Sequence, residues 1–125
     1  MKLQRLLLCI VLLASSCYQA PLDCQNFKTG TYVSEILING KKQRTTSVRT
    51  DQYVIETYKG KTDTARIRWV NDCEFILTKL HPKNRAEQQA VSIRIVRTTK
   101  KSYTFEFGLI GNSKRQKGTA TKLAN

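Results

Sequence analysis

The stretch TGTYVSEILINGKKQRTTSVR, Thr29 to Arg49, contains two strand-like segments joined by the dipeptide Asn39-Gly40. Asn-Gly is the preferred pair for a two-residue type I′ turn, because both central positions need a positive φ. A two-residue loop places Glu35 opposite Arg44, which is a favourable cross-strand charge pair. The stretch therefore predicts an antiparallel β-hairpin.

Short segments of alternating apolar and polar residues continue through the rest of the chain, and no segment has a convincing helical period. The further strands we expect are Tyr53–Tyr58, Thr64–Val70, Cys73–Leu80, Val91–Thr98, Ser102–Ile110 and Gly118–Leu123. Spacings of about 8 to 12 residues are typical of an all-β sandwich or barrel. Every connection is short enough for antiparallel neighbours, so we predict an all-β, eight-stranded antiparallel meander that closes into a barrel. A two-sheet β-sandwich is the alternative.

Two later hairpins have apolar patterns that disagree with the shortest turn. A two-residue turn at Asn71-Asp72 would place Trp69 opposite Glu74, whereas an odd loop places Trp69 opposite Phe75. Because the hydrophobic pattern sets the register, we predict the odd loop, with or without a β-bulge. The same parity argument predicts an odd turn around residues 99–101.

The aromatic residues with the clearest alternation stand on the apolar faces of the predicted strands. They are Trp69, Phe75, Phe105 and Phe107. Eight strands enclose room for side chains or for one small ligand, so we expect these four to line or fill the interior. With about 100 ordered residues the core is modest.

The first residues have the features of an export signal. Lys2 and Arg5 precede the apolar run LLLCIVLL, Leu6 to Leu13. This run is too short for a membrane-spanning helix, which needs about 20 apolar residues. The five positions from Leu13 to Cys17 resemble the lipobox of bacterial lipoproteins, except that Ala14 stands where that family usually has leucine.

The lipobox resemblance implies that Cys17 is acylated and becomes the first mature residue. Residues 1–16 are then a lipoprotein signal peptide, 17–26 a lipidated tether and 27–125 the β-barrel domain. Two or more acyl chains anchor a protein stably. We therefore expect a cell-envelope protein that is lipid-anchored to a bacterial membrane, and the outer membrane is the favoured one. The alternatives are an ordinary secretory peptide cut near the same place and an uncleaved signal anchor.

The predicted export signal assigns different roles to the four cysteines. With Cys9 in the signal and Cys17 on the lipid, two cysteines remain in an oxidising compartment, and we predict a Cys24–Cys73 disulfide. By restricting the unfolded chain, a disulfide that closes such a loop stabilises the folded state by about 4 kcal/mol. Two unpaired buried thiols are the alternative. Metal binding is disfavoured by a single histidine, His81, and the lack of any CxxC, and we expect no cofactor.

The chain is strongly basic, with a formal charge of +13 that falls by two, to +11, when Lys2 and Arg5 leave with the signal. Such a charge favours anionic partners, including lipid headgroups, acidic glycans and nucleic acid. The basic residues are scattered, however, so a solvated basic surface is the plainer interpretation. A base-stacking sheet needs exposed aromatic residues, and an exported protein does not meet the chromosome, so we expect no specific nucleic acid.

The tripeptide Gly30-Thr31-Tyr32, preceded by Cys24 and Phe27, looks like the opening of lipocalin-like barrels. Segments that resemble a family of small bacterial envelope lipoproteins of undetermined function are Cys24–Tyr32, Ile67–Pro82, Ser102–Gly111 and Lys117–Leu123. Many members carry the label "DNA topoisomerase IV". That label is unsupported here, because a type II topoisomerase needs a large DNA-gate domain and an ATPase module with a phosphate-cradling glycine loop. The resemblance implies a lipocalin-like barrel and an envelope address, and its matching cysteines support the disulfide.

No residue set indicates catalysis. His81 lies in a His-Pro turn without a nucleophile motif, and the nine carboxylates form no recognisable acid–base pair. We therefore expect a non-enzymatic, monomeric, lipid-anchored protein that binds a small or lipidic ligand or a protein partner. The alternative is a basic interaction module that contacts anionic lipid, glycan or nucleic acid.

Overall fold

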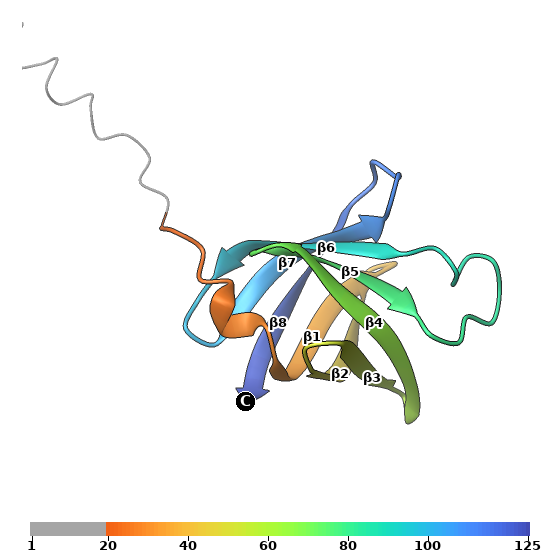
Figure 1. Cartoon of the computed structure of the whole chain (residues 1–125), viewed down its shortest axis with the longest axis horizontal. Coiled ribbons are helices and arrows are strands. Elements are labelled where there is room, and N and C mark those ends of the chain that lie inside the picture. The colour runs from red at the N-terminus through yellow and green to blue at the C-terminus, as the bar shows by residue number, and fades with distance from the viewer. Residues whose placement is uncertain (1–19) are drawn as a thin grey trace, which may run out of the picture.

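The computed structural model describes residues 20–125, and the predicted signal peptide and Cys17 lie outside the described residues. Eight antiparallel strands follow one another around a closed barrel (Figure 1). A short 3-10 helix, η2 (Gln25–Phe27), precedes them. The strands are β1 (Gly30–Ile38), β2 (Lys41–Arg49), β3 (Tyr53–Tyr58), β4 (Lys61–Asn71), β5 (Glu74–Lys79), β6 (Val91–Thr98), β7 (Ser102–Leu109) and β8 (Gln116–Ala124). The predicted all-β meander with a lipocalin-like barrel is confirmed, and closure excludes the two-sheet sandwich.

The barrel closes because β1 pairs with β8 as well as with β2. Gly118 on β8 lies opposite Ile36 on β1 and Phe105 on β7. A Cβ atom at Gly118 would come within 2.6 Å of both side chains. Glycine at this position therefore lets β8 lie close to the Ile36 and Phe105 side chains while it pairs with β1 and closes the barrel.

Two hairpins use two-residue turns with left-handed backbone. The first turn, Asn39-Gly40, has φ values of 52° and 76°, and it places Glu35 opposite Arg44 as predicted. The turn Lys59-Gly60 repeats this device, with φ values of 49° and 75°. Because this turn contains only two residues, β4 begins at Lys61, three residues before the predicted start of that strand.

The β4–β5 and β6–β7 hairpins are the two whose apolar patterns disagree with the shortest turn. They keep the predicted apolar pairing, but through a register shift within the strands. Trp69 lies opposite Phe75 as expected, but Asn71 pairs with Glu74 across a two-residue turn, and the register shifts between Trp69 and Asn71. The prediction that the loop itself is odd is therefore wrong. A β-bulge supplies the extra residue that returns the apolar side chains to one face.

The β6–β7 hairpin repeats this arrangement. Thr98 pairs with Tyr103, so an even number of residues, 99–102, lies between these two partners, and the register shifts between Ile95 and Arg97. The expected odd turn at residues 99–101 is thus also replaced by a bulge. The bulge keeps Ile95 opposite Phe105, so the apolar register is the predicted one.

The two ends of the barrel differ. Connections 50–52, 72–73 and 99–101 lie at one end together with η2, at the left in Figure 1, and we call this the closed end. Connections 39–40, 59–60, 80–90 and 110–115 lie at the other end, which we call the open end. The largest fully buried side chains are Tyr32, Phe27, Phe75 and Ile95. Phe27 belongs to η2, so the fully buried core includes the region where η2 covers the closed end.

Candidate functional site

The interior of the barrel above this core is a cavity of about 540 Å³. Its walls come from alternate positions of the strands, because successive side chains of a strand point to opposite faces. The strands contribute ten apolar side chains to it, namely Ile36, Val54, Ala65, Phe75, Leu77, Val91, Ile93, Phe105, Phe107 and Leu109, and the 80–90 connection contributes Ala86. Polar side chains gather at the open end, and Arg49 and Tyr103 lie at the closed end of the lining. The cavity is therefore an apolar chamber with a polar mouth.

Arg49, at the end of β2, forms part of the floor of the cavity and is only 6% exposed. Its Nη1 atom donates a hydrogen bond to the carbonyl oxygen of Phe27 (2.8 Å), and its Nη2 atom donates one to the hydroxyl of Tyr103 (2.7 Å). The guanidinium carbon lies 4.4 Å from the ring centroid of Tyr32 and 4.7 Å from that of Phe75. Such stacking suits the planar, weakly hydrated guanidinium. Arg49 therefore joins η2 to the barrel wall.

The Tyr32 side chain is fully buried beneath Arg49. Its hydroxyl donates a hydrogen bond to the carbonyl oxygen of Thr29 (2.7 Å). Burial raises the pKa of this phenol to about 12, although the nearby Arg49 cation opposes the change. The phenol therefore stays protonated and keeps its hydrogen bond over the physiological pH range.

The Cys24–Cys73 disulfide attaches η2 to the β4–β5 turn, with the two Cα atoms 5.3 Å apart. Beside it, Lys28 donates a hydrogen bond to the carbonyl oxygen of Asp72 (3.1 Å). The Lys28 ammonium also lies 3.4 Å from the centroid of a Trp69 ring. Desolvation lowers the pKa of Lys28, and the Asp72 charge opposes that change. These contacts hold the segment before β1 across the closed end.

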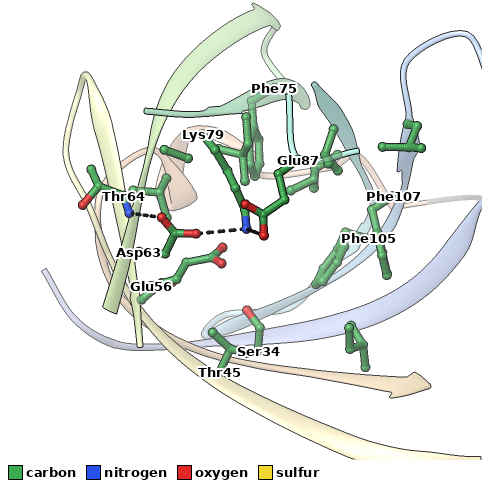
Figure 2. Close-up of a pocket in the computed structure, with 18 of the residues that line it drawn as sticks. Ser34, Thr45, Glu56, Asp63, Thr64, Phe75, Lys79, Glu87, Phe105 and Phe107 are labelled. Carbon is green, nitrogen blue, oxygen red and sulfur yellow. Dashed lines mark hydrogen bonds and ion pairs between the residues drawn. The ribbon is translucent and has the colours of Figure 1, made fainter. Parts of the chain in front are cut away.

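Three carboxylates and one ammonium line the mouth of the cavity, as Figure 2 shows. Lys79 on β5 extends between Asp63 on β4 and Glu87 in the 80–90 connection. Its Nζ atom lies 3.0 Å from Asp63 Oδ2 and 3.2 Å from Glu87 Oε1. The backbone amide of Lys83 donates a further hydrogen bond to Glu87 Oε2 (2.8 Å). Lys79 thereby holds the 80–90 connection against the rim.

These contacts lower the pKa values of the two carboxyl groups and raise the pKa of the ammonium group. The hydrogen bond from Lys79 lowers the pKa of Asp63, and the bond with Asp63 raises the pKa of Lys79. The backbone amide of Lys83, followed by Lys79, lowers the pKa of Glu87. All three groups are therefore charged at neutral pH, and the rim contacts persist there.

Glu56 on β3 differs from its neighbours. It lies directly opposite Asp63, and within residues 20–125 its carboxylate makes no hydrogen bond or ion pair. The Glu56 side chain is exposed to solvent, yet protein atoms surround it on most sides, because its exposed surface faces the cavity. Desolvation, followed by the negative charge of Asp63, raises its pKa. Glu56 is thus the rim carboxylate with unused hydrogen-bonding capacity.

The four aromatic residues expected in the interior occupy two positions. Phe75, Phe105 and Phe107 line the cavity (Figure 2). Trp69 packs against Phe75 with ring centroids 4.6 Å apart and lies beneath Lys28 near the closed end, outside the cavity lining. The interior therefore divides into a packed floor and an open chamber.

The roles of Arg49 and of the rim residues Glu56, Asp63, Lys79 and Glu87 were not predicted from the sequence. Alternation does contain a signal for two of them. Val54 is buried, so Glu56 two positions later points to the same side, and its cross-strand partner Asp63 follows. Glu87 carries no such signal, because it belongs to a connection rather than to a strand.

Residues 20–125 do not bring three His, Cys, Asp or Glu side chains into an arrangement suited to a metal ion. His81 is exposed in the 80–90 connection. The same residues contain no helix with the length and apolarity that a membrane-spanning segment requires. What the described arrangement can do is hold an apolar molecule and offer polar groups at one end of it.

No protein-family model, curated protein or solved structure matches the chain.

Proposed function

We propose that the protein binds one small, largely apolar ligand inside the barrel, and that its function is binding rather than catalysis. The observation that carries the proposal is the cavity of about 540 Å³, to which the strands contribute ten apolar side chains. Small-molecule sites have volumes of about 300–1,000 Å³, apolar walls and a few polar groups that orient the ligand. The polar groups here lie at the mouth, so the ligand places its apolar part deep and its polar part outward.

The floor favours a preformed chamber. Arg49 and the disulfide hold η2 across the closed end, so the ligand enters from the open end past the 80–90 connection. A rigid site loses less conformational entropy on binding than a site that must first form.

The test uses the fluorescent apolar probe N-phenyl-1-naphthylamine and two variants with the same new side chain. Ala65→Phe fills part of the cavity, and Val48→Phe places the same ring on the outer wall, where Val48 is exposed. We expect Ala65→Phe to weaken probe binding by at least about tenfold, since an occluded pocket loses apolar contact area, and Val48→Phe to have little effect. Leu77→Phe, in the neighbouring strand, serves as a second occluding variant. Equal binding by all of these proteins would contradict the proposal.

We further propose that the protein is exported and lipid-anchored at Cys17. The likeness of residues 13–17 to a lipobox supports this address, and so does the Cys24–Cys73 disulfide, because such bonds persist in oxidising compartments. Intact-mass analysis of the membrane-bound form is the test. We expect an acylated Cys17 as the first residue and a mass two hydrogens short for the disulfide. A chain that retains Met1 would contradict the proposal.

A further inference from the structure

The open end of the barrel carries a concentration of positive charge. Eight exposed basic side chains belong to its connections and adjoining strand ends: Lys41, Lys42, Lys59, Lys61, Lys83, Arg85, Lys114 and Lys117. The one carboxylate in the four open-end connections is Glu87, and Lys79 binds it. Within residues 20–125, Lys42, which lies 3.6 Å from Glu35, is the one member of the eight in an ion pair. This basic rim is therefore largely uncompensated.

The closed end lacks this excess. Its connections, the adjoining strand ends and the segment before β1 carry five basic and four acidic residues, namely Lys28, Arg49, Arg97, Lys100, Lys101, Asp23, Asp51, Asp72 and Glu74. One of the lysines, Lys28, is already engaged by Trp69 and by the backbone of Asp72. The positive field of the described chain is thus directed toward the end where the cavity opens.

Apolar side chains accompany the basic rim. Leu37 is 64% exposed and Ile110 is 54% exposed, and Ile38 and Leu80 are each 36% exposed. Scattered exposed apolar residues are common on soluble proteins. Here, however, each one has basic neighbours. Leu37 and Ile38 end β1, across the turn from Lys41 and Lys42. Leu80 and Ile110 each begin a connection that carries lysine and arginine. A surface that combines apolar tips with basic neighbours matches the boundary between lipid headgroups and acyl chains.

We propose that the open end of the barrel docks on the surface of an anionic lipid bilayer. The eight basic side chains lie at the level of the negative headgroups, and Leu37 and Ile110 insert into the boundary beneath them. Docking directs the mouth of the cavity toward the bilayer. The N-terminal side of the described chain joins the barrel at the closed end (Figure 1), so the segment that leads to Cys17 and the basic rim lie at opposite ends of the barrel. The proposal does not depend on whether the cavity holds a ligand.

A bilayer is favoured over a soluble polyanion because of the apolar tips. A polyanion such as an acidic glycan attracts the charges alone, whereas a bilayer accepts both the charges and the apolar side chains. Electrostatic attraction to anionic lipid adds up over neighbouring basic residues and weakens with salt. The two kinds of partner therefore give different results when the apolar tips are removed.

The experiment measures partition of the full chain onto vesicles of mixed phosphatidylglycerol and phosphatidylcholine at low and high salt. Vesicles of phosphatidylcholine alone measure the contribution of the chain's apolar N-terminal part, which is subtracted. Two triple variants remove the same charge: Lys41→Gln/Lys61→Gln/Lys114→Gln at the open end and Arg97→Gln/Lys100→Gln/Lys101→Gln at the closed end. Each lysine near an anionic surface contributes about fivefold, so the open-end variant should lose at least about tenfold in partition. The closed-end variant should lose much less.

The double variant Leu37→Ser/Ile110→Ser completes the test. We expect it to weaken vesicle partition while its binding to heparin, a soluble polyanion, is unchanged. Equal losses for the two triple variants would overturn the proposal, because net charge rather than the open end would then account for binding. Unchanged vesicle partition of the double variant would also overturn it in favour of a polyanion-binding face. If the chain binds the anionic vesicles no better than the neutral ones, docking of the open end on anionic lipid is excluded.

Discussion

Glu56 on β3 and Asp63 on β4 lie directly opposite each other at the mouth of the cavity, and their pKa values are displaced in opposite directions. The cause is the position of one ammonium. Lys79 donates to Asp63, whereas Glu56 makes no such contact within residues 20–125 and faces both desolvation and the charge of Asp63. The rim therefore holds one satisfied carboxylate next to one that is not.

Substitution of Glu56 by glutamine should stabilise the fold at neutral pH. A carboxyl group with a raised pKa destabilises the folded state once it ionises. Glu56→Gln should therefore raise the free energy of unfolding at pH 7, by no more than about 1 kcal/mol, because the carboxylate is partly solvated within the cavity. The gain should vanish as the pH falls through the raised pKa of Glu56 to below its ordinary value of 4.5. Urea unfolding at a series of pH values measures this difference.

Asp63→Asn is the matched variant with the opposite sign. The pKa of Asp63 is lowered in the folded state, so its ionised form stabilises the fold above its ordinary value of 3.8. The variant should be less stable than the parent at pH 7, and the difference should shrink as the pH falls below that value. The same pH trend in both variants would show that the two carboxylates are not differentiated by Lys79.

Removal of the Lys79 ammonium should release the 80–90 connection. Lys79→Gln deletes the contacts with Asp63 and Glu87, and we expect faster hydrogen exchange at the Lys83 amide, which donates to Glu87. Global stability should change little, because these ion pairs are solvent-exposed. Lys83→Gln removes the same charge from a side chain that forms no ion pair within the described residues, and it serves as the control. Unaltered protection in residues 80–90 of Lys79→Gln would contradict a tethering role.

Arg49 should be irreplaceable by lysine. Arg49→Lys keeps the charge but loses the planar fork that reaches Phe27 and Tyr103 and the stacking between Tyr32 and Phe75. We expect a loss of about 2 kcal/mol in the free energy of unfolding, because hydrogen bonds from a charged donor are worth about 1.5–3 kcal/mol each and lysine recovers part of them.

Tyr103→Phe provides the graded comparison for Arg49. It removes a single acceptor of the Arg49 hydrogen bonds and keeps the ring, so the loss should be about 1 kcal/mol. Denaturant unfolding measures both variants. An Arg49→Lys protein as stable as the parent would show that the floor does not depend on the guanidinium.

Loss of the disulfide should lower stability and loosen the floor. Cys24 and Cys73 are separated by 49 positions, so the bond restricts the unfolded chain by about 4 kcal/mol in the loop-entropy description. We expect Cys24→Ser/Cys73→Ser to lose stability of this order and to show faster hydrogen exchange in η2. The parent protein under reducing conditions should behave in the same way. A reduced parent with unchanged stability would contradict the prediction.

The strand pairing was predictable wherever the sequence carries a local signal. Asn39-Gly40 specified its turn, and the alternation of Trp69 and Phe75 specified their pairing. The choice between an odd loop and an even loop with a bulge was not predictable, because both give the same side-chain parity. The sequence pattern reports which face a residue occupies, and both solutions satisfy it.

The candidate site was predictable in its apolar part only. Phe75, Phe105 and Phe107 follow from period-two alternation, but the position of Arg49 beneath the cavity depends on two distant partners, Phe27 and Tyr103. Contacts of this kind join residues far apart in the sequence, so no local pattern contains them.

By itself, the sequence determined the fold class and the order of strands, because alternation, turn residues and short connections are local properties of the chain. Only the tertiary structure decided that the interior is a chamber rather than a filled core. It also decided that Lys79 serves Asp63 and leaves Glu56 without a partner. Closing a sheet into a barrel brings side chains from non-adjacent strands around one space. The volume of that space and the charges that meet at its mouth depend on all eight strands together.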